Sequence, residues 1–235
     1  MQRVRRKKQD SDVSKTLDWI EKAVLTSVKP YGFRKHGRTL HRFVDGDISQ
    51  VVGFQLGQAY RGETHLLWVN VGIRVPECMN RSFSPEETPK KYYHEYDCNI
   101  RSRLGLIEGK EEACFDLQKD AEPILEDILR QVQNVVIPAF EVLSSREAIL
   151  EARRNYPSFD ILNHHLILLE EAMIYGRSGD TQRASETFNQ YYQLFGSGQL
   201  VQKDPNAIRN HLNYLNGLAG KLGINIKGEY QNGKE

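Results

Sequence analysis

Cysteine is scarce in this chain, and long apolar stretches are absent. The 235 residues include only Cys78, Cys98 and Cys114, an odd number at wide spacing that indicates reduced thiols rather than a disulfide framework. No apolar run approaches the roughly 20 residues that a membrane-spanning helix needs. The basic N-terminus is followed by the mainly polar residues 9–15, where a signal peptide would carry an apolar stretch. These absences predict a cytoplasmic protein with no membrane-bound part.

Recognisable catalytic and metal-binding motifs are also lacking. The sequence contains no G-x-S-x-G elbow, no P-loop and no G-x-G-x-x-G fingerprint. His94 and Cys98 stand four residues apart, but a structural zinc site pairs its ligands at close spacing twice. His36 and His41 are five apart in or beside one strand, which predicts that they face opposite ways. We therefore expect a protein without catalytic residues, metal or cofactor.

The charge is nearly balanced but unevenly distributed. The net charge is +1, yet the first nine residues, MQRVRRKKQ, hold basic side chains and no acidic ones. The basic residues of this head are Arg3, Arg5, Arg6, Lys7 and Lys8. Such a head is either an arm that touches nucleic acid or an acidic partner, or a solvated, frayed terminus. No aromatic residue interleaves the basic ones, as it would in many nucleic-acid binders.

The N-terminal half has the pattern of an α+β domain. Apolar residues at helical spacing predict a first helix that begins near Ser14 and ends before Pro30. Alternating patterns then predict an antiparallel sheet of about four strands, and Asp45-Gly46-Asp47 is a tight-turn signal between the first two. The expected strands cover residues 38–44, 48–56, 64–75 and 99–107.

The C-terminal half is expected to be helical. Apolar stripes predict helices over residues 121–136 and 145–154, with Pro138 bending or restarting the first, and a last helix over 205–222. Between them, the spacing of Ala172, Tyr175, Gly179, Ala184 and Phe188 resembles a single tetratricopeptide repeat. Because one repeat cannot form a solenoid, we expect this hairpin to pack on the rest of the chain. The expected organisation is a flexible head (1–13), an α+β domain (14–150), a helical hairpin region (151–226) and a tail (227–235).

Several short motifs, in order, resemble a known family. They are Gly32-Phe33, Phe54-Gln55, Asn70-Val71-Gly72 and Arg101-x-Arg103. With their spacing they resemble the bacterial family catalogued as domain of unknown function 4304, over roughly residues 17–145. The resemblance implies an α+β domain of bacterial origin. It carries no catalytic residues, and the C-terminal hairpin lies outside it.

The strand phases predict one apolar and one polar face for the sheet. In residues 64–75, THLLWVNVGIRV, the side chains of Leu67, Val69, Val71 and Ile73 face the core. The opposite side, termed here the reverse face, is expected to collect Gln55, Trp68, Asn70, Arg74, Arg101 and Arg103. Tryptophan and arginine are favoured at interaction surfaces, because each covers much area while keeping a polar group. The same face would also fit a solvated surface, one covered by the C-terminal helices, or a small-ligand site.

The preferred hypothesis is a non-enzymatic protein-interaction module with the reverse face as its partner-binding surface. An immunity or adaptor protein is one specific form of it, by analogy with other small bacterial α+β proteins. The alternative is a nucleic-acid-binding protein that uses the basic head with Arg38 and Arg42 of the first β-hairpin.

Overall fold

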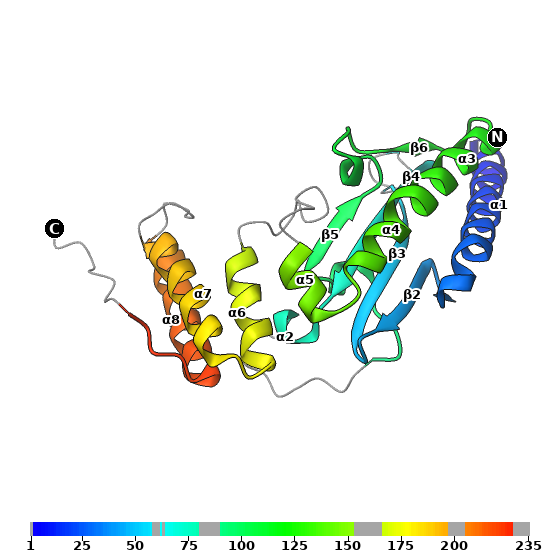
Figure 1. Ribbon diagram of the computed structural model, residues 1–235. Helices are drawn as coiled ribbons and strands as arrows, with labels where there is room; N and C mark the ends of the chain where they lie inside the picture. The colour runs from blue at the N-terminus through cyan, green and yellow to red at the C-terminus, as the bar shows by residue number, and fades with distance from the viewer. Residues whose placement is uncertain are drawn as a thin grey trace. The chain divides into compact units, whose positions relative to one another are not determined.

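The chain contains two compact units, residues 1–75 with 90–162 and residues 76–89 with 163–235. The computed structural model describes residues 2–57, 62, 64–79, 90–152, 166–196 and 205–227, of which 2–11, 196, 205 and 207 are described by their backbone alone. Figure 1 shows the sheet and its helices in the first unit and a group of helices in the second.

The first unit is built on an antiparallel sheet, so the predicted α+β class is confirmed. Its path runs β1-β2-β3-β4-β5, and β6 pairs with β4. The strands are β1 (Arg34–His36), β2 (Thr39–Val44), β3 (Ile48–Leu56), β4 (Leu66–Arg74), β5 (Ile100–Arg103) and β6 (Phe115–Asp116). The two strands beyond the four expected, β1 and β6, have only three and two residues. Pieces this short show too little alternation to be recognised.

The turn between β2 and β3 forms where the sequence predicts it. Asp45 has φ 48° and Gly46 has φ 80°, left-handed values within the three-residue loop that joins the paired residues Val44 and Ile48. Both acids of the turn also bind Arg146, whose Nη1 lies 3.2 Å from Asp45 Oδ2 and whose Nη2 lies 2.8 Å from Asp47 Oδ1. The turn therefore fixes the hairpin register and holds the start of α5 (Arg146–Ala152).

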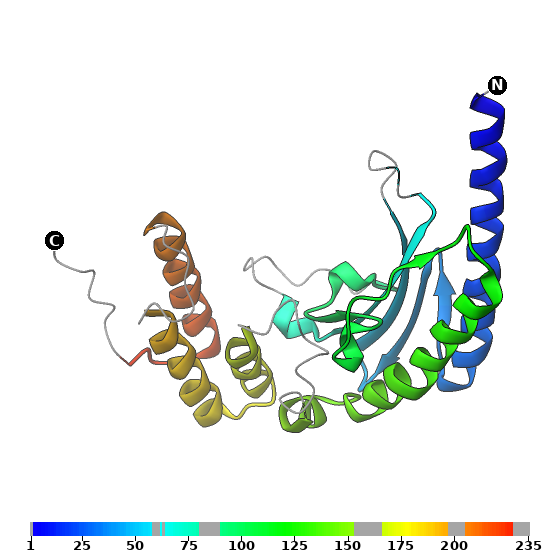
Figure 2. The same ribbon diagram turned by 90° about the horizontal axis from the view of Figure 1, so that it is seen from above.

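Helices cover the apolar face of the sheet, where the core lies (Figures 1 and 2). They are α1 (Gln2–Val28), α3 (Ala121–Gln131), the π-helical segment η5 (Val132–Val136) and α4 (Ile137–Val142). Val52 pairs with Val71 and Phe54 with Val69, and all four are 5% exposed or less, as the alternation predicts. Pro138 lies in the first turn of α4, where its missing amide donor costs nothing, so it restarts the helix as expected.

The start of the first helix differs from the prediction. The helix α1 begins at Gln2, so Ser14 lies inside it rather than capping it. Arginine, lysine and glutamine are good helix formers, and the basic head consequently continues the helix toward the N-terminus. Figure 2 shows that this end of α1 extends past the sheet.

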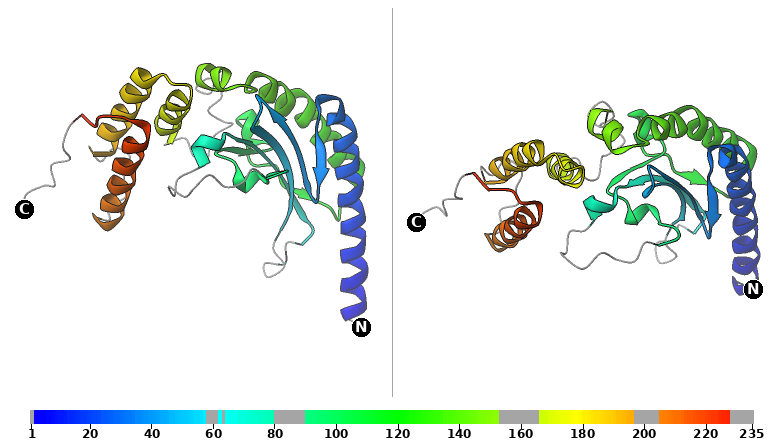
Figure 3. Two further views of the ribbon diagram at one scale, coloured as in Figure 1. Left: turned by 90° about the horizontal axis from the view of Figure 1, so that it is seen from below. Right: turned by 60° about the horizontal axis from the view of Figure 1, so that its bottom comes forward.

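The second unit is helical and contains the expected hairpin. It comprises α2 (Pro76–Met79), α6 (Ile167–Arg177), α7 (Thr181–Gly196) and α8 (Pro205–Leu222), and α7 packs against both α6 and α8 (Figure 3). Gly179 makes the turn between α6 and α7 with φ 83°. Ala172, Ala184 and Phe188 are fully buried between the helices. The likeness of this hairpin to a tetratricopeptide repeat stays a prediction.

None of the helices in the described part of the chain combines the length and the apolar character needed to cross a membrane.

Candidate functional site: the reverse face and its strap

The strand register brings the predicted site residues to one face. Gln55 pairs with Trp68 between β3 and β4, and Asn70 pairs with Arg103 between β4 and β5. Arg101 pairs with Gly72, two residues from Arg74. Because paired and alternate residues share a face, all six predicted side chains lie on the side opposite the core.

The reverse face is not open, however, because the chain itself crosses it. Residues 90–99, termed here the strap, lie over β1 to β4 and include the short helix η3 (Glu95–Asp97). The Tyr92 ring stacks on His36 of β1, with ring centroids 3.4 Å apart. His94 Nδ1 lies 2.8 Å from Thr39 Oγ1 of β2. The segment between β4 and β5 thus covers the reverse face, whereas a cover by the C-terminal helices was one expectation from the sequence.

Two glycines in the strands make room for the strap. A Cβ atom on Gly53 would lie 2.7 Å from Glu95 Oε2, and one on Gly72 would lie 2.8 Å from the Cys98 side chain. Glycine inside a strand often marks the close approach of another segment. This signal, on the polar side of two neighbouring strands, was present in the sequence and could have located the strap.

Three of the predicted partner-binding residues hydrogen-bond to one another. Arg103 Nε donates to Asn70 Oδ1 at 2.8 Å, and Asn70 Nδ2 donates to Gln55 Oε1 at 2.9 Å. Arg103 also forms an ion pair with Glu112. Asn70 is 5% exposed, and a second, longer contact of 3.5 Å joins its Nδ2 to Glu95 Oε1. This network ties three strands to the strap, which leaves Asn70 and Arg103 few groups to offer a partner.

Histidines and aromatic rings gather where the strap meets β1 and β2. His36 and His41 face the same side, contrary to the prediction, because Gly37 (φ 55°) turns the chain between two strands and interrupts their common alternation. His41 is 8% exposed and its Nδ1 has no hydrogen-bond partner among the described residues. Burial lowers the pKa of His41, and the neighbouring His36, Arg34 and His94 lower it further.

His94 and Cys98, which stand four residues apart in the sequence, both lie in the strap. Within the described residues no group of three or more histidine, cysteine or acidic side chains is arranged to hold a metal ion. The Cys98 Sγ lies 3.5 Å from the His94 backbone oxygen, and burial raises the pKa of this thiol, with Glu95 and Asp97 adding to the effect. Because a metal-binding cysteine must be a thiolate, this protonated, buried thiol is a poor ligand.

The outer side of the strap exposes large rings. Tyr96 is 63% exposed and stacks on His94, with ring centroids 4.9 Å apart. Phe43 of β2 is 41% exposed and contacts Tyr93, whose own ring is almost buried. Lys91, which precedes Tyr92 in the strap, and Arg34 of β1 are both exposed. The result is an aromatic surface bordered by basic groups and held in place by the sheet beneath it.

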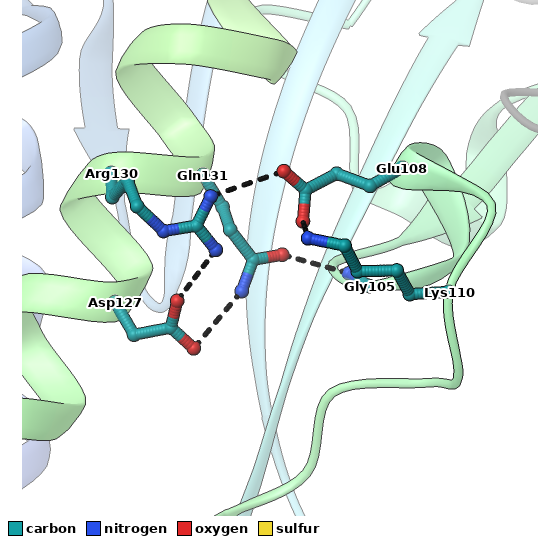
Figure 4. Close-up of polar contacts among 6 residues, drawn as sticks. All are labelled: Gly105, Glu108, Lys110, Asp127, Arg130 and Gln131. Carbon is teal, nitrogen blue, oxygen red and sulfur yellow. Dashed lines mark hydrogen bonds and ion pairs between the residues drawn. The ribbon is translucent and has the colours of Figure 1, made fainter.

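The C-terminal end of β5, which carries Arg101 and Arg103, is anchored to α3 (Figure 4). The amide of Gly105 donates to Gln131 Oε1 at 2.8 Å, and Gln131 Nε2 donates to Asp127 at 3.2 Å. Arg130 bridges Asp127 on its own helix and Glu108 in the loop, at 2.8 and 3.1 Å. This brace fixes where β5 ends.

The brace has one electrostatic consequence. Hydrogen bonds from Arg130, and next from Lys110, hold the pKa of Glu108 below its ordinary value. Glu108 therefore stays ionised in mildly acidic solution, and its contacts with α3 persist there.

Of the residues proposed for nucleic-acid binding, Arg42 has another role. It is 9% exposed and points to the core side, where Nη1 donates to the backbone oxygen of Tyr31 and Nη2 pairs with Glu141. A phosphate group could reach it only by breaking these contacts. Arg38 is accessible and lies 3.9 Å from Glu21. The side chains of the basic head lie outside the described residues.

Comparison with protein families matches residues 24–142, slightly more than half of the chain, to the family described as domain of unknown function (DUF4304). Searches of curated proteins and of solved structures returned no match.

Proposed function

The chain belongs to the DUF4304 family, and we propose that it is a non-enzymatic protein-interaction module that binds a partner through the outer side of the strap. The contact surface comprises Phe43, Tyr92 and Tyr96, with Arg34 and Lys91 at its border. A bacterial, cytoplasmic setting belongs to this proposal, and an immunity or adaptor role is one form of it.

The observation that carries the proposal is the exposure of Tyr96. A ring that is 63% exposed yet stacked on His94 is held in one orientation. A partner that covers it gains apolar contact area without first ordering the side chain. Tyrosines of this kind are over-represented among the residues that dominate binding energy.

Charge indicates the chemistry of the partner. The pKa of His41 is lowered, after burial, by His36, Arg34 and His94, which are all basic. The basic side chains of Arg34 and Lys91 at the border of this surface favour an acidic protein surface and accelerate its encounter. The strap itself adds no net charge, because its two acids, Glu95 and Asp97, are balanced by Lys90 and Lys91.

The nucleic-acid alternative would rest on the same surface. Exposed tyrosines beside basic groups are also typical of single-strand binding. The near-neutral net charge and the internal pairing of Arg42 favour the protein partner.

The test is a capture experiment in which three baits are compared: wild type, Tyr96→Ala and Trp19→Ala. Trp19 is 42% exposed on α1 and provides a control in which a similar aromatic surface is removed elsewhere. The lysate is treated with nuclease, so that bridging nucleic acid is destroyed. We expect a protein that wild type and Trp19→Ala retain and Tyr96→Ala loses. With the purified partner, Tyr96→Ala should weaken binding by about 2 kcal/mol. Equal capture by all three baits contradicts the proposal, and binding abolished by nuclease supports the alternative.

A further inference from the structure

Two arginines of the reverse face lack an internal partner. Arg74 and Arg101 form no hydrogen bond and no ion pair with any residue that the structure describes. The guanidinium of Arg74 lies over the Tyr93 ring, 4.0 Å from its centroid. The Nε atom of Arg101 is shielded from solvent without an acceptor, although the side chain as a whole is half-exposed.

The neighbouring Arg103 shows that this is not a general property of the face. Arg103 leaves the same strand on the same side, and its guanidinium donates to Asn70 and pairs with Glu112. Arg101 is two residues away and makes neither kind of contact with the residues that the structure describes. A shielded donor without an acceptor is unfavourable, and more so when it is charged.

The nearby acids are committed elsewhere. Glu95 accepts from Asn70 at 3.5 Å, and Asp97 accepts from the His94 amide at 3.0 Å and pairs with Lys90. Both are near enough to raise the pKa of the Cys98 thiol, but neither reaches an arginine. The thiol stays protonated and provides no counter-charge. Among the described residues, no acid pairs with either of these two positive groups.

Their placement on the sheet brings the two groups together. Arg101 pairs with Gly72, and Arg74 follows Gly72 by two residues on the same face. Such diagonal neighbours lie about 7 Å apart, which one ligand with several oxygens can span. A Cβ atom on Gly72 would lie 2.8 Å from the Cys98 side chain, so Cys98 lies above Gly72 on this face.

We infer that Arg74 and Arg101 form a binding site for an oxyanion, either a carboxylate or a phosphate group. The guanidinium of Arg101 would donate from its Nη groups, because Nε is shielded from solvent, and charge-assisted hydrogen bonds of this kind suit such groups. Arg74, fixed over Tyr93, adds a second charge. The site does not depend on the strap's outer surface, because neither Tyr96 nor Phe43 contributes to it.

The test uses the full chain and two probes, inorganic phosphate and an acetylated tetraglutamate peptide, each compared with chloride at equal ionic strength. Thermal unfolding is followed by tryptophan fluorescence, because both tryptophans, Trp19 and Trp68, lie in the first unit. A ligand that binds only the folded state raises the midpoint temperature with its concentration. Binding is measured directly by the shift of the Arg101 Nε–Hε signal in ¹H–¹⁵N spectra, which Arg101→Lys identifies by its absence.

The variants are Arg101→Gln and Arg74→Gln, with Arg177→Gln as the charge-matched control, because Arg177 is exposed at the end of α6. Phosphate stabilises proteins in general, so the difference between variants is decisive. We expect Arg101→Gln to weaken binding at least about tenfold, the effect of one charge-assisted hydrogen bond, and Arg177→Gln to leave it unchanged.

Each outcome decides the inference. Specific stabilisation by phosphate alone assigns the site to a phosphate group, and stabilisation by the peptide assigns it to a carboxylate. Equal stabilisation of wild type and Arg101→Gln overturns the site. In chloride, Arg101→Gln should be at least as stable as wild type, since no described residue loses a hydrogen bond or an ion pair to the arginine; failure of this variant to fold would show a structural role instead.

Discussion

Substituting Gln50 tests the packing of the core most directly. Gln50 lies on the apolar face of β3 and is fully buried. Its Nε2 donates to the Phe140 and Leu143 oxygens at 2.6 and 3.1 Å, and its Oε1 accepts from Arg42 Nε at 2.7 Å. One side chain therefore joins the hairpin to the end of α4 and satisfies a buried charge.

The cost of Gln50→Ala follows from the groups it leaves unpaired. Leaving the charged Arg42 donor unpaired costs about 1.5–3 kcal/mol of stability, and leaving the two carbonyl groups unpaired costs about 1 kcal/mol each. We therefore expect the free energy of unfolding to fall by about 3–5 kcal/mol, a large part of the 5–15 kcal/mol typical of a domain. Urea unfolding followed by tryptophan fluorescence reports this, since both tryptophans belong to the same unit as Gln50.

The matched control is Gln133→Ala, an exposed position in η5 of the same helical path. It should change the free energy of unfolding by no more than about 0.5 kcal/mol. In the double variant Arg42→Met, Gln50→Met, both members of the polar pair are removed, so the loss should be smaller than the sum of the two single losses. A cost below about 1 kcal/mol for Gln50→Ala would refute the reasoning that this glutamine links the hairpin to α4.

Three further outcomes follow from single positions. Gly105→Ala should lose at least about 2 kcal/mol of stability, because φ is 84° and the new Cβ would lie 2.0 Å from a backbone oxygen; Gly109→Ala, at φ 71° with nothing within 4 Å, should cost less in the same urea assay. The pKa of Glu108 is lowered in the fold by Arg130, so the stability that Glu108 contributes is present above its unfolded pKa and is lost as pH falls through the folded value. Glu108→Gln should therefore reduce the acid dependence of the free energy of unfolding, measured between pH 3 and pH 6. An unchanged slope contradicts the brace. The pKa of His41 is lowered below 6.5, chiefly by burial, so stability should fall as pH drops below about 6.5, by at most about 1.4 kcal/mol per pH unit, and His41→Phe should flatten that slope.

The sequence predicts regular elements best where one strong pattern operates. Residues 48–56 form β3 with the bounds that the alternation gave, and α8 spans residues 205–222 as expected. The short strand β1 escaped because Arg34, Lys35 and His36 are all exposed and show no alternation. Its pairing with β2 depends on the turn at Gly37, which only the three-dimensional backbone reveals. The mistaken placement of His36 and His41 on opposite faces followed from the same omission.

The candidate site was predicted in composition but not in exposure. Strand parity alone places Trp68, Asn70 and Arg101 on one side of the sheet, and the register confirms it. Parity says nothing about what lies above that side. A segment without periodicity, residues 90–99, covers it, and such segments are the hardest to place from sequence. Glycines at positions 53 and 72 were the available sign of close approach.

The strap divides the reverse face into two kinds of polar residue. Where an arginine meets an internal acceptor, as Arg103 meets Asn70 and Glu112, the group stabilises the fold. Where the strap brings an aromatic ring or a protonated thiol instead, as at Arg74 and Arg101, no described residue supplies an anion to the positive group. A single carboxylate in place of the Tyr93 ring or the Cys98 thiol would have given the neighbouring arginine an internal acceptor. An external oxyanion therefore has the most to contribute at Arg74 and Arg101. Substitution of the paired Arg103 should affect stability alone.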